Sequence, residues 1–138
     1  MEALKLDPMN AAARDRLKAV TVRRDLINAK IAEVEKAINA DSGNIKLLYT
    51  AASLSSGKAD YESALKYLEK AVQIQPRNPD TYYNIACIKA KQNRPQEAVR
   101  FLKEAFNKGF DRWDMLKSDN DLRNIHDTEF YKNLLKNH

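Results

Sequence analysis

Small and apolar residues recur along the middle of the chain with a period of 34 residues. An offset of 34 residues brings Ala64, Leu68 and Ala71 onto Ala98, Leu102 and Ala105. The same offset brings Leu48, Ala51 and Ala52 onto Tyr82, Ile85 and Ala86. A period of this length, with small residues where two helices approach closely, is typical of stacked helix-turn-helix units. The pattern predicts helical hairpins between residues 43 and 110, with Ala64 and Ala98 buried at the close contacts.

Polar turn signals divide this region into four helices. The predicted ranges are Ile45 to Ser55, Asp60 or Tyr61 to Ile74, Pro79 to Lys91, and Pro95 to Lys108. Ser42 or Asn44 can cap the first helix, Gly43 offers a left-handed exit from the preceding segment, and Gly109 ends the last helix. Asn78 followed by Pro79 suits the cap and first turn of the third helix.

Residues 11–40 contain no Gly or Pro, and two interpretations of this segment compete. The 34-residue register starts a hairpin at Ala11, but Lys30 then falls where Ala64 and Ala98 stand, and nothing marks a turn near Asp25. The alternative is one continuous helix of roughly 30 residues, about 45 Å long. The missing turn favours the long helix.

The long helix carries an apolar stripe with heptad spacing, which must be covered by the following hairpins or by a second copy of the chain. Homodimerisation through this stripe is therefore one prediction, and its residues are Leu17, Val20, Ile27, Ile31, Val34 and Ile38. Ahead of the helix, Ala3, Leu6 and Pro8 repeat the spacing of a hairpin end. This predicts that residues 1–42 begin inside a repeat of a longer protein.

The period dissolves after Gly109 into three short segments that each start at an aspartate suited to capping. The predicted pieces are Asp111 to Lys117, Asp119 to Ile125 and Asp127 to Leu135. Their apolar anchors are Phe110, Trp113, Leu116, Leu122, Ile125, Phe130 and Leu134. Because a stack of hairpins has an open apolar end, residues 111–138 are predicted to cap it.

Composition supports an all-α fold, because the chain has three Gly and four Pro in 138 residues. No apolar run approaches the roughly 20 residues of a membrane span, so we expect no membrane contact. The single cysteine, Cys87, forbids an internal disulfide and favours a reducing, cytoplasmic setting, although a periplasmic domain or the soluble part of a membrane protein would also fit.

The net charge of +5 is concentrated in residues 43–110, which hold 11 basic and 6 acidic residues. Such an excess can attract an acidic peptide or a phosphate backbone, or can merely form the solvated outer faces of helices. The basic residues lack interleaved aromatics and a recognition helix, which makes nucleic acid the weaker alternative.

No catalytic, cofactor or metal site is predicted. Cys87 is far in sequence from His126 and His138, so a Cys–His nucleophile or zinc site would need an improbable convergence. The aspartates at 111, 114, 119, 121 and 127 lack the central Gly and closing Glu of a calcium loop. There is also no glycine-rich phosphate loop, and we expect no enzyme.

The stretch from Ile45 to Phe110 resembles tandem tetratricopeptide repeats (TPRs). The resemblance is carried by residues 61–72 and by Tyr82 to Ala86 together with Glu97 and Ala98. The tail from Gly109 to Phe130 resembles the segment that closes such arrays. Ser55 and Lys89 depart from the family, which usually has an aromatic residue there. The resemblance implies a TPR-like α-solenoid, with a long helix before it and capping helices after it.

The resemblance also implies a scaffold that binds a peptide or helix of a partner along its concave face. Carried over residue by residue, the groove positions are Lys46, Tyr49, Thr50, Ser53, Asp80, Tyr83, Asn84, Cys87 and Lys91. Tyr49, Tyr83 and Asn84 are the main candidates, because exposed aromatics and an amide suit peptide binding, although the tyrosines could instead pack between hairpins. Asn84 alone matches the family's clamp for acidic chaperone tails, so we do not expect that ligand.

The predicted function is thus a non-catalytic protein-interaction module, part of a larger protein. The alternative is a structural module that self-associates through its long helix.

Overall fold

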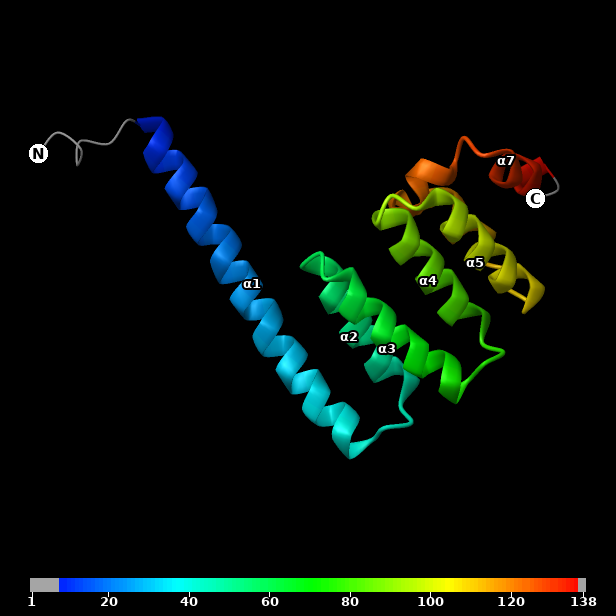
Figure 1. The fold of residues 1–138 in the computed structure, drawn as a ribbon, viewed down its shortest axis with the longest axis horizontal. Coiled ribbons are helices and arrows are strands. Elements are labelled where there is room, and N and C mark those ends of the chain that lie inside the picture. Colours follow the sequence, from blue (N-terminus) through cyan, green and yellow to red (C-terminus); the bar gives the residue numbers. More distant parts are fainter. Residues whose placement is uncertain (1–7, 137–138) are drawn as a thin grey trace, which may run out of the picture.

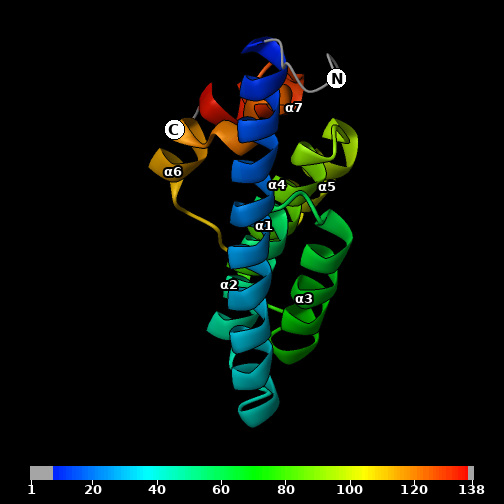
Figure 2. The same ribbon diagram turned by 90° about the vertical axis from the view of Figure 1, so that its left-hand side faces the viewer.

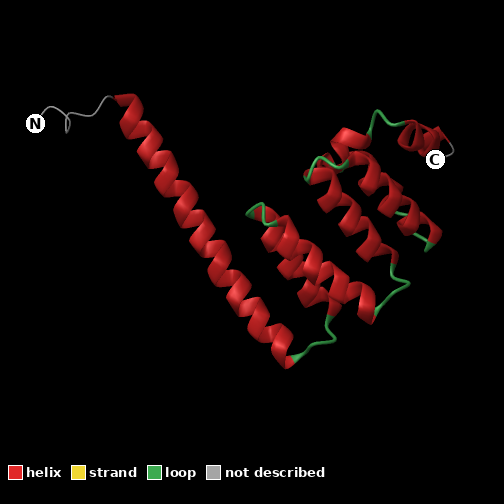
Figure 3. Cartoon of the chain, viewed as in Figure 1, coloured by secondary structure: helices red, strands yellow, loops and turns green. Residues whose placement is uncertain are grey.

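The computed structural model describes residues 8–136, which form helices and no strand (Figure 3). In chain order the elements are α1 (Pro8–Ala40), α2 (Ile45–Gly57), α3 (Tyr61–Ile74), α4 (Pro79–Lys91), α5 (Pro95–Asn107), α6 (Trp113–Ser118), the 3₁₀ helix η2 (Asn120–Ile125) and α7 (Glu129–Lys136). Each predicted helix of the repeat region is present, and its ends agree with the prediction within two residues. Within this part of the chain, no helix is both long enough and apolar enough to span a membrane.

The two hairpins, α2–α3 and α4–α5, lie side by side and form a short solenoid (Figure 1). Ala64, Ala71, Ala98 and Ala105 are fully buried, as the repeat pattern predicts. Their small side chains let the helix backbones approach, while Leu68, 1% exposed, and its equivalents fill the space between them. The prediction of stacked hairpins is therefore confirmed at the positions on which it rested.

Local hydrogen bonds explain where the hairpin helices begin. The Asn44 side chain accepts from the backbone N–H of Lys46 at 3.1 Å, and the Asn78 side chain accepts from the N–H of Asp80 at 2.9 Å. Gly109, with φ +99°, ends α5 as expected. Gly43 does not adopt a positive φ, because the bend before α2 is closed by a bond from the Asn44 N–H to the Asp41 carbonyl.

The turn inside each hairpin contains one residue in the left-handed conformation. Ala59 and Asn93, which are 34 positions apart, have φ values of 61° and 59°. The left-handed conformation costs little for Asn and more for Ala, so the packing of the two helices enforces it at Ala59.

The long helix is one continuous element, which settles the competition between the two interpretations of residues 11–40. Its C-terminal half packs on α2, where Val34 is 7% exposed and Ile27, Ile31 and Ile38 are half-buried. The Tyr67 hydroxyl of α3 donates to Glu35 at 2.5 Å. Burial and this bond raise the pKa of Tyr67 to about 12, so the tyrosine stays protonated at neutral pH.

The N-terminal half of α1 runs past the α2–α3 hairpin and extends away from the other described helices in Figure 1, and α1 faces the viewer in Figure 2. Leu17 is 67% exposed and Val20 is 54% exposed. The apolar stripe is thus divided into a covered part and an open part, and self-association stays a prediction that concerns the open part. The predicted hairpin end at Met1 to Asp7 lies outside the described residues.

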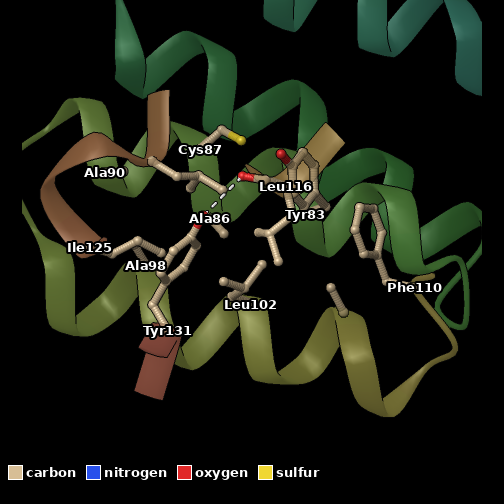
Figure 4. Packing of buried hydrophobic residues seen from close by; sticks show 12 residues of the cluster. Tyr83, Ala86, Cys87, Ala90, Ala98, Leu102, Phe110, Leu116, Ile125 and Tyr131 are labelled. Atoms are coloured by element: carbon tan, nitrogen blue, oxygen red, sulfur yellow. Dashed lines mark hydrogen bonds between the residues drawn. The ribbon is translucent and has the colours of Figure 1, made fainter. Parts of the chain in front are cut away.

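The segment after Gly109 covers the open end of α4 and α5 (Figure 4). Leu116, Leu122 and Ile125 are fully buried in one cluster with Leu102. Below them, Tyr131 donates to the Leu116 carbonyl at 3.4 Å, drawn as the dashed line in Figure 4. The predicted capping role of the tail is therefore present in the structure.

The predicted helix caps of the tail are only partly correct. Asp119 caps η2 by accepting from the N–H of Asp121 at 2.9 Å. Helix α6 starts at Trp113, so the N-cap position falls on Arg112 rather than on Asp111. At α7 the Thr128 hydroxyl, and not Asp127, accepts from the N–H of Tyr131 at 3.2 Å.

The buried alanines generate the first testable prediction. Ala98→Leu should lower the free energy of unfolding by about 1–3 kcal/mol, because a larger side chain has no space at the α4–α5 contact. The matched control is Ala19→Leu on the exposed part of α1, which should change stability little. Urea unfolding measures both variants, and equal effects would contradict the packing described here.

Candidate peptide-binding groove

A groove of about 310 Å³ lies between α2, α4 and the cap. Helix α2 contributes Tyr49, Ala52, Ser53 and Ser56, and α3 contributes Leu68. Helix α4 supplies one long wall with Tyr83, Asn84, Cys87, Ile88 and Lys91. The cap supplies the opposite end with Met115, Asp119 and Asp121. The groove is therefore built by the first helices of both hairpins together with the closing segment.

Six of the nine predicted groove residues line this groove, namely Tyr49, Ser53, Tyr83, Asn84, Cys87 and Lys91. The other three lie outside it. The Thr50 hydroxyl donates to the Lys46 carbonyl at 2.9 Å on an exposed part of α2. Asp80 forms an ion pair with Arg112 of the cap. Lys46 and Asp80 precede the groove residues of α2 and α4, and Thr50 is on a different face of α2 from its neighbour Tyr49.

Of the two interpretations of Tyr83, an exposed groove aromatic or a packed residue, the structure supports packing. Its side chain is 1% exposed, and its ring stacks on Phe110 with centroids 4.4 Å apart. Its hydroxyl donates to the Asp119 carboxylate at 2.6 Å. Burial and the neighbouring carboxylate raise the pKa of Tyr83 far above its ordinary value. The cap, whose position the repeat pattern does not encode, is what covers this ring.

Tyr49 is half-buried, and its hydroxyl shares a 2.6 Å hydrogen bond with the Thr81 hydroxyl of α4. Burial raises the pKa of Tyr49 as well. This bond joins the two hairpins and fixes the ring of Tyr49 at the groove. Tyr49 can thus offer apolar surface to a ligand, but its hydroxyl is already engaged.

The Asn84 amide forms no hydrogen bond with any residue in the described part of the chain. It is half-buried on the wall of α4, next to Cys87 on the helix face. A free side-chain amide offers two donors and one acceptor. This pattern can pair with the N–H and C=O groups of another polypeptide backbone.

Lys91 and Asp121 form the ion pair of the groove, while Asp119 accepts only from uncharged groups. Lys91 donates to the Ser56 hydroxyl at 2.9 Å and lies 3.5 Å from the Asp121 carboxylate. Asp119 accepts from Tyr83 and from the Cys87 thiol, whose sulfur is 3.6 Å away. The groove therefore keeps one carboxylate, Asp119, whose charge no cation of the described residues balances, and the rest of its lining is apolar, neutral or paired.

Cys87, Asp119 and Asp121 bring one sulfur and two carboxylates within 4.8 Å of one another. Burial and the two carboxylates raise the pKa of the Cys87 thiol far above its ordinary value. A protonated thiol is a poor nucleophile and a poor metal ligand at neutral pH. The cluster acts as a hydrogen-bonded joint between α4 and the cap. His126 stacks on Tyr131 within the cap, and His138 lies outside the described residues.

The groove residues of the cap and of the groove floor were not predicted from the sequence. Met115, Asp119 and Asp121 were assigned only to the closing segment, and no periodic signal relates them to α4. Ala52 and Ser56 could have been found, because they follow Tyr49 and Ser53 at helical spacing on the same face of α2.

Stacked antiparallel hairpins with a groove along their first helices define an α-solenoid of the helical-repeat class. The tetratricopeptide repeat family model matches residues 54–119, from the end of α2 into the cap. The tetratricopeptide-repeat resemblance predicted from the sequence is confirmed over these residues. It is also 30% identical over 84 residues to a chloroplastic protein of Arabidopsis thaliana. This alignment covers 59% of the chain and 25% of that protein, so the chain spans about a quarter of the relative's length.

The bond between Tyr83 and Asp119 generates the second prediction. Tyr83→Phe should lower the free energy of unfolding by roughly 1.5–3 kcal/mol, because it removes a buried hydrogen bond to a charged group. The matched control is Tyr82→Phe, since the Tyr82 hydroxyl donates only to the Pro76 carbonyl in an exposed setting. Urea unfolding of both variants is the measurement. A loss no larger for Tyr83→Phe than for Tyr82→Phe would contradict this role for Asp119.

Proposed function

We propose that this chain is a non-catalytic interaction module that binds a short polypeptide segment of a partner in the groove between α2, α4 and the cap. Tetratricopeptide repeats generally mediate contacts between proteins. The observation that carries the proposal is the unpaired amide of Asn84 on the groove wall. It can form hydrogen bonds with a polypeptide backbone beside the apolar lining residues Tyr49, Ala52 and Ile88.

The surroundings of Asn84 support a particular kind of ligand. Tyr49 and Ala52 lie on one side of the groove, and Met115, 39% exposed, lies at the cap end. These side chains provide apolar contact area, while Lys91 and Asp121 already satisfy each other. The bound segment is therefore proposed to carry apolar and neutral polar side chains rather than a run of acidic ones.

The size of the groove also favours a polypeptide over a small molecule. Its volume of about 310 Å³ is at the lower end of the range for sites that enclose a small ligand. A polypeptide needs only a few side chains seated in such a groove, with the rest of the segment lying along the solenoid. For the compartment we propose a reducing one, which the single cysteine supports.

Asn84 provides the test of this function. Peptides selected from a random phage library against the chain should bind Asn84→Ala about tenfold more weakly, as expected for the loss of a pair of hydrogen bonds. The matched control is Asn107→Ala, which removes an exposed amide at the end of α5 and should leave affinity unchanged. Fluorescence anisotropy with labelled peptides measures the affinities.

Two results would contradict the proposal. The first is a set of selected peptides that bind Asn84→Ala and the unaltered chain equally well. The second is a selection that yields no peptide able to distinguish the folded chain from an unrelated helical protein.

A further inference from the structure

The open half of α1 carries apolar side chains at positions that hold helix–helix contacts elsewhere in the chain. Leu17 lies 34 residues before Ala51 and 68 before Ile85, which are 0% and 5% exposed. Val20 lies 68 residues before Ile88, which is 6% exposed. Leu17 and Val20 themselves are 67% and 54% exposed. At the equivalent positions of the later repeats, the residues are therefore packed against another helix.

This open surface continues an interface that the structure already contains. Helix α2 covers the stripe of α1 around Val34 and ends at Gly57, where Lys58 donates to the Asn28 side chain at 2.7 Å. Beyond that point a notch of about 260 Å³ is lined by Val20, Arg23, Arg24, Ile27 and the α2–α3 turn. A second helix placed on α1 would thus follow α2 end to end along the same stripe.

The charge of this surface indicates which kind of helix fits it. Residues 14–25 hold Arg14, Arg16, Lys18, Arg23 and Arg24 against Asp15 and Asp25. None of the five basic side chains forms an ion pair with a residue in the range 8–136. A second copy of the chain would bring the same excess of positive charge to the contact, which opposes its approach.

We propose that the N-terminal half of α1, with Leu17, Val20, Arg23, Arg24 and Ile27, binds an acidic amphipathic helix of a partner protein. Apolar side chains of that helix seat against Leu17 and in the notch between Val20 and Ile27. Its carboxylates face Arg23 and Arg24 at the rim. This surface is separate from the groove at Asn84, so the two proposed binding sites can be tested independently.

Two other polyanions fit the arrangement less well. A helix that lies on a membrane presents its apolar residues on one face, but Val20 and Val22, both exposed, are two residues apart and point to nearly opposite sides of α1. Nucleic acid would neutralise the arginines but leave Leu17 and Val20 uncovered. A polypeptide helix satisfies both the apolar and the charged parts of the surface.

The test uses two designed heptad peptides with the same apolar positions, one with glutamate and one with lysine at the flanking positions. The glutamate peptide should bind the chain, and the lysine peptide should not. Arg23→Gln combined with Arg24→Gln should weaken binding of the glutamate peptide roughly three- to thirtyfold. Leu17→Ser combined with Val20→Ser should weaken it about tenfold or more.

The matched control combines Lys70→Gln with Arg77→Gln, which removes two exposed positive charges far along the chain from α1 and should leave affinity unchanged. Circular dichroism checks that every variant keeps its helices. Binding is also measured to anionic vesicles of phosphatidylserine in phosphatidylcholine and to a DNA duplex. Light scattering gives the mass of the chain alone.

Several outcomes would overturn the proposal. No binding of the glutamate peptide at about 1 mM would do so, since that concentration corresponds to a very weak complex. Equal weakening by the control pair Lys70→Gln and Arg77→Gln would show that binding depends on net charge and not on this surface. Binding of vesicles or of the DNA duplex that is lost in the Leu17 and Val20 variant would assign the surface to a membrane or to nucleic acid. A dimeric mass that the glutamate peptide does not reduce would assign it to a second copy of the chain.

Discussion

The structure depends on covering the apolar end of the second hairpin. Helices α4 and α5 present Tyr83, Ala86 and Leu102 on a face that no further repeat covers, and the cap closes it with Leu116, Leu122 and Ile125. The stack of Tyr83 on Phe110 and the bond from Tyr83 to Asp119 hold these two parts together. Burial of this face supplies the stabilisation, while the hydrogen bond fixes one orientation of the cap.

The same contact shapes the surface on which the proposed function rests. Asp119 and Asp121 reach the groove only because the cap docks on α4, and there they engage the polar groups of Cys87 and Lys91. With these groups satisfied, the Asn84 amide and the exposed Ser53 hydroxyl remain open to a ligand. At the other end of the molecule α1 is supported along half of its length, so its apolar stripe serves both as internal packing and as free surface.

The sequence predicts the parts of this fold in which small and apolar residues recur periodically. The alanines at 64 and 98 encode the hairpins, because only small residues fit where helices touch, and the helix ends follow from Asn44, Asn78 and Gly109. The contacts of Tyr83 with Phe110 and Asp119 and the groove position of Asp119 were not predictable, since the cap has no period that relates it to α4. The heptad stripe of α1 shows which residues are apolar, but spacing alone does not show how far α2 extends along it.

The central claim is that the cap and the second hairpin form one cooperative unit, and two local probes test it directly. Trp113, the single tryptophan, lies in the cap, and Leu102 is fully buried in α5. A urea titration can follow Trp113 by fluorescence and Leu102 by its methyl resonances in the same samples. Coincident transitions with one midpoint are the predicted result. A change at Trp113 at lower urea, while Leu102 keeps its native resonances, would contradict the account.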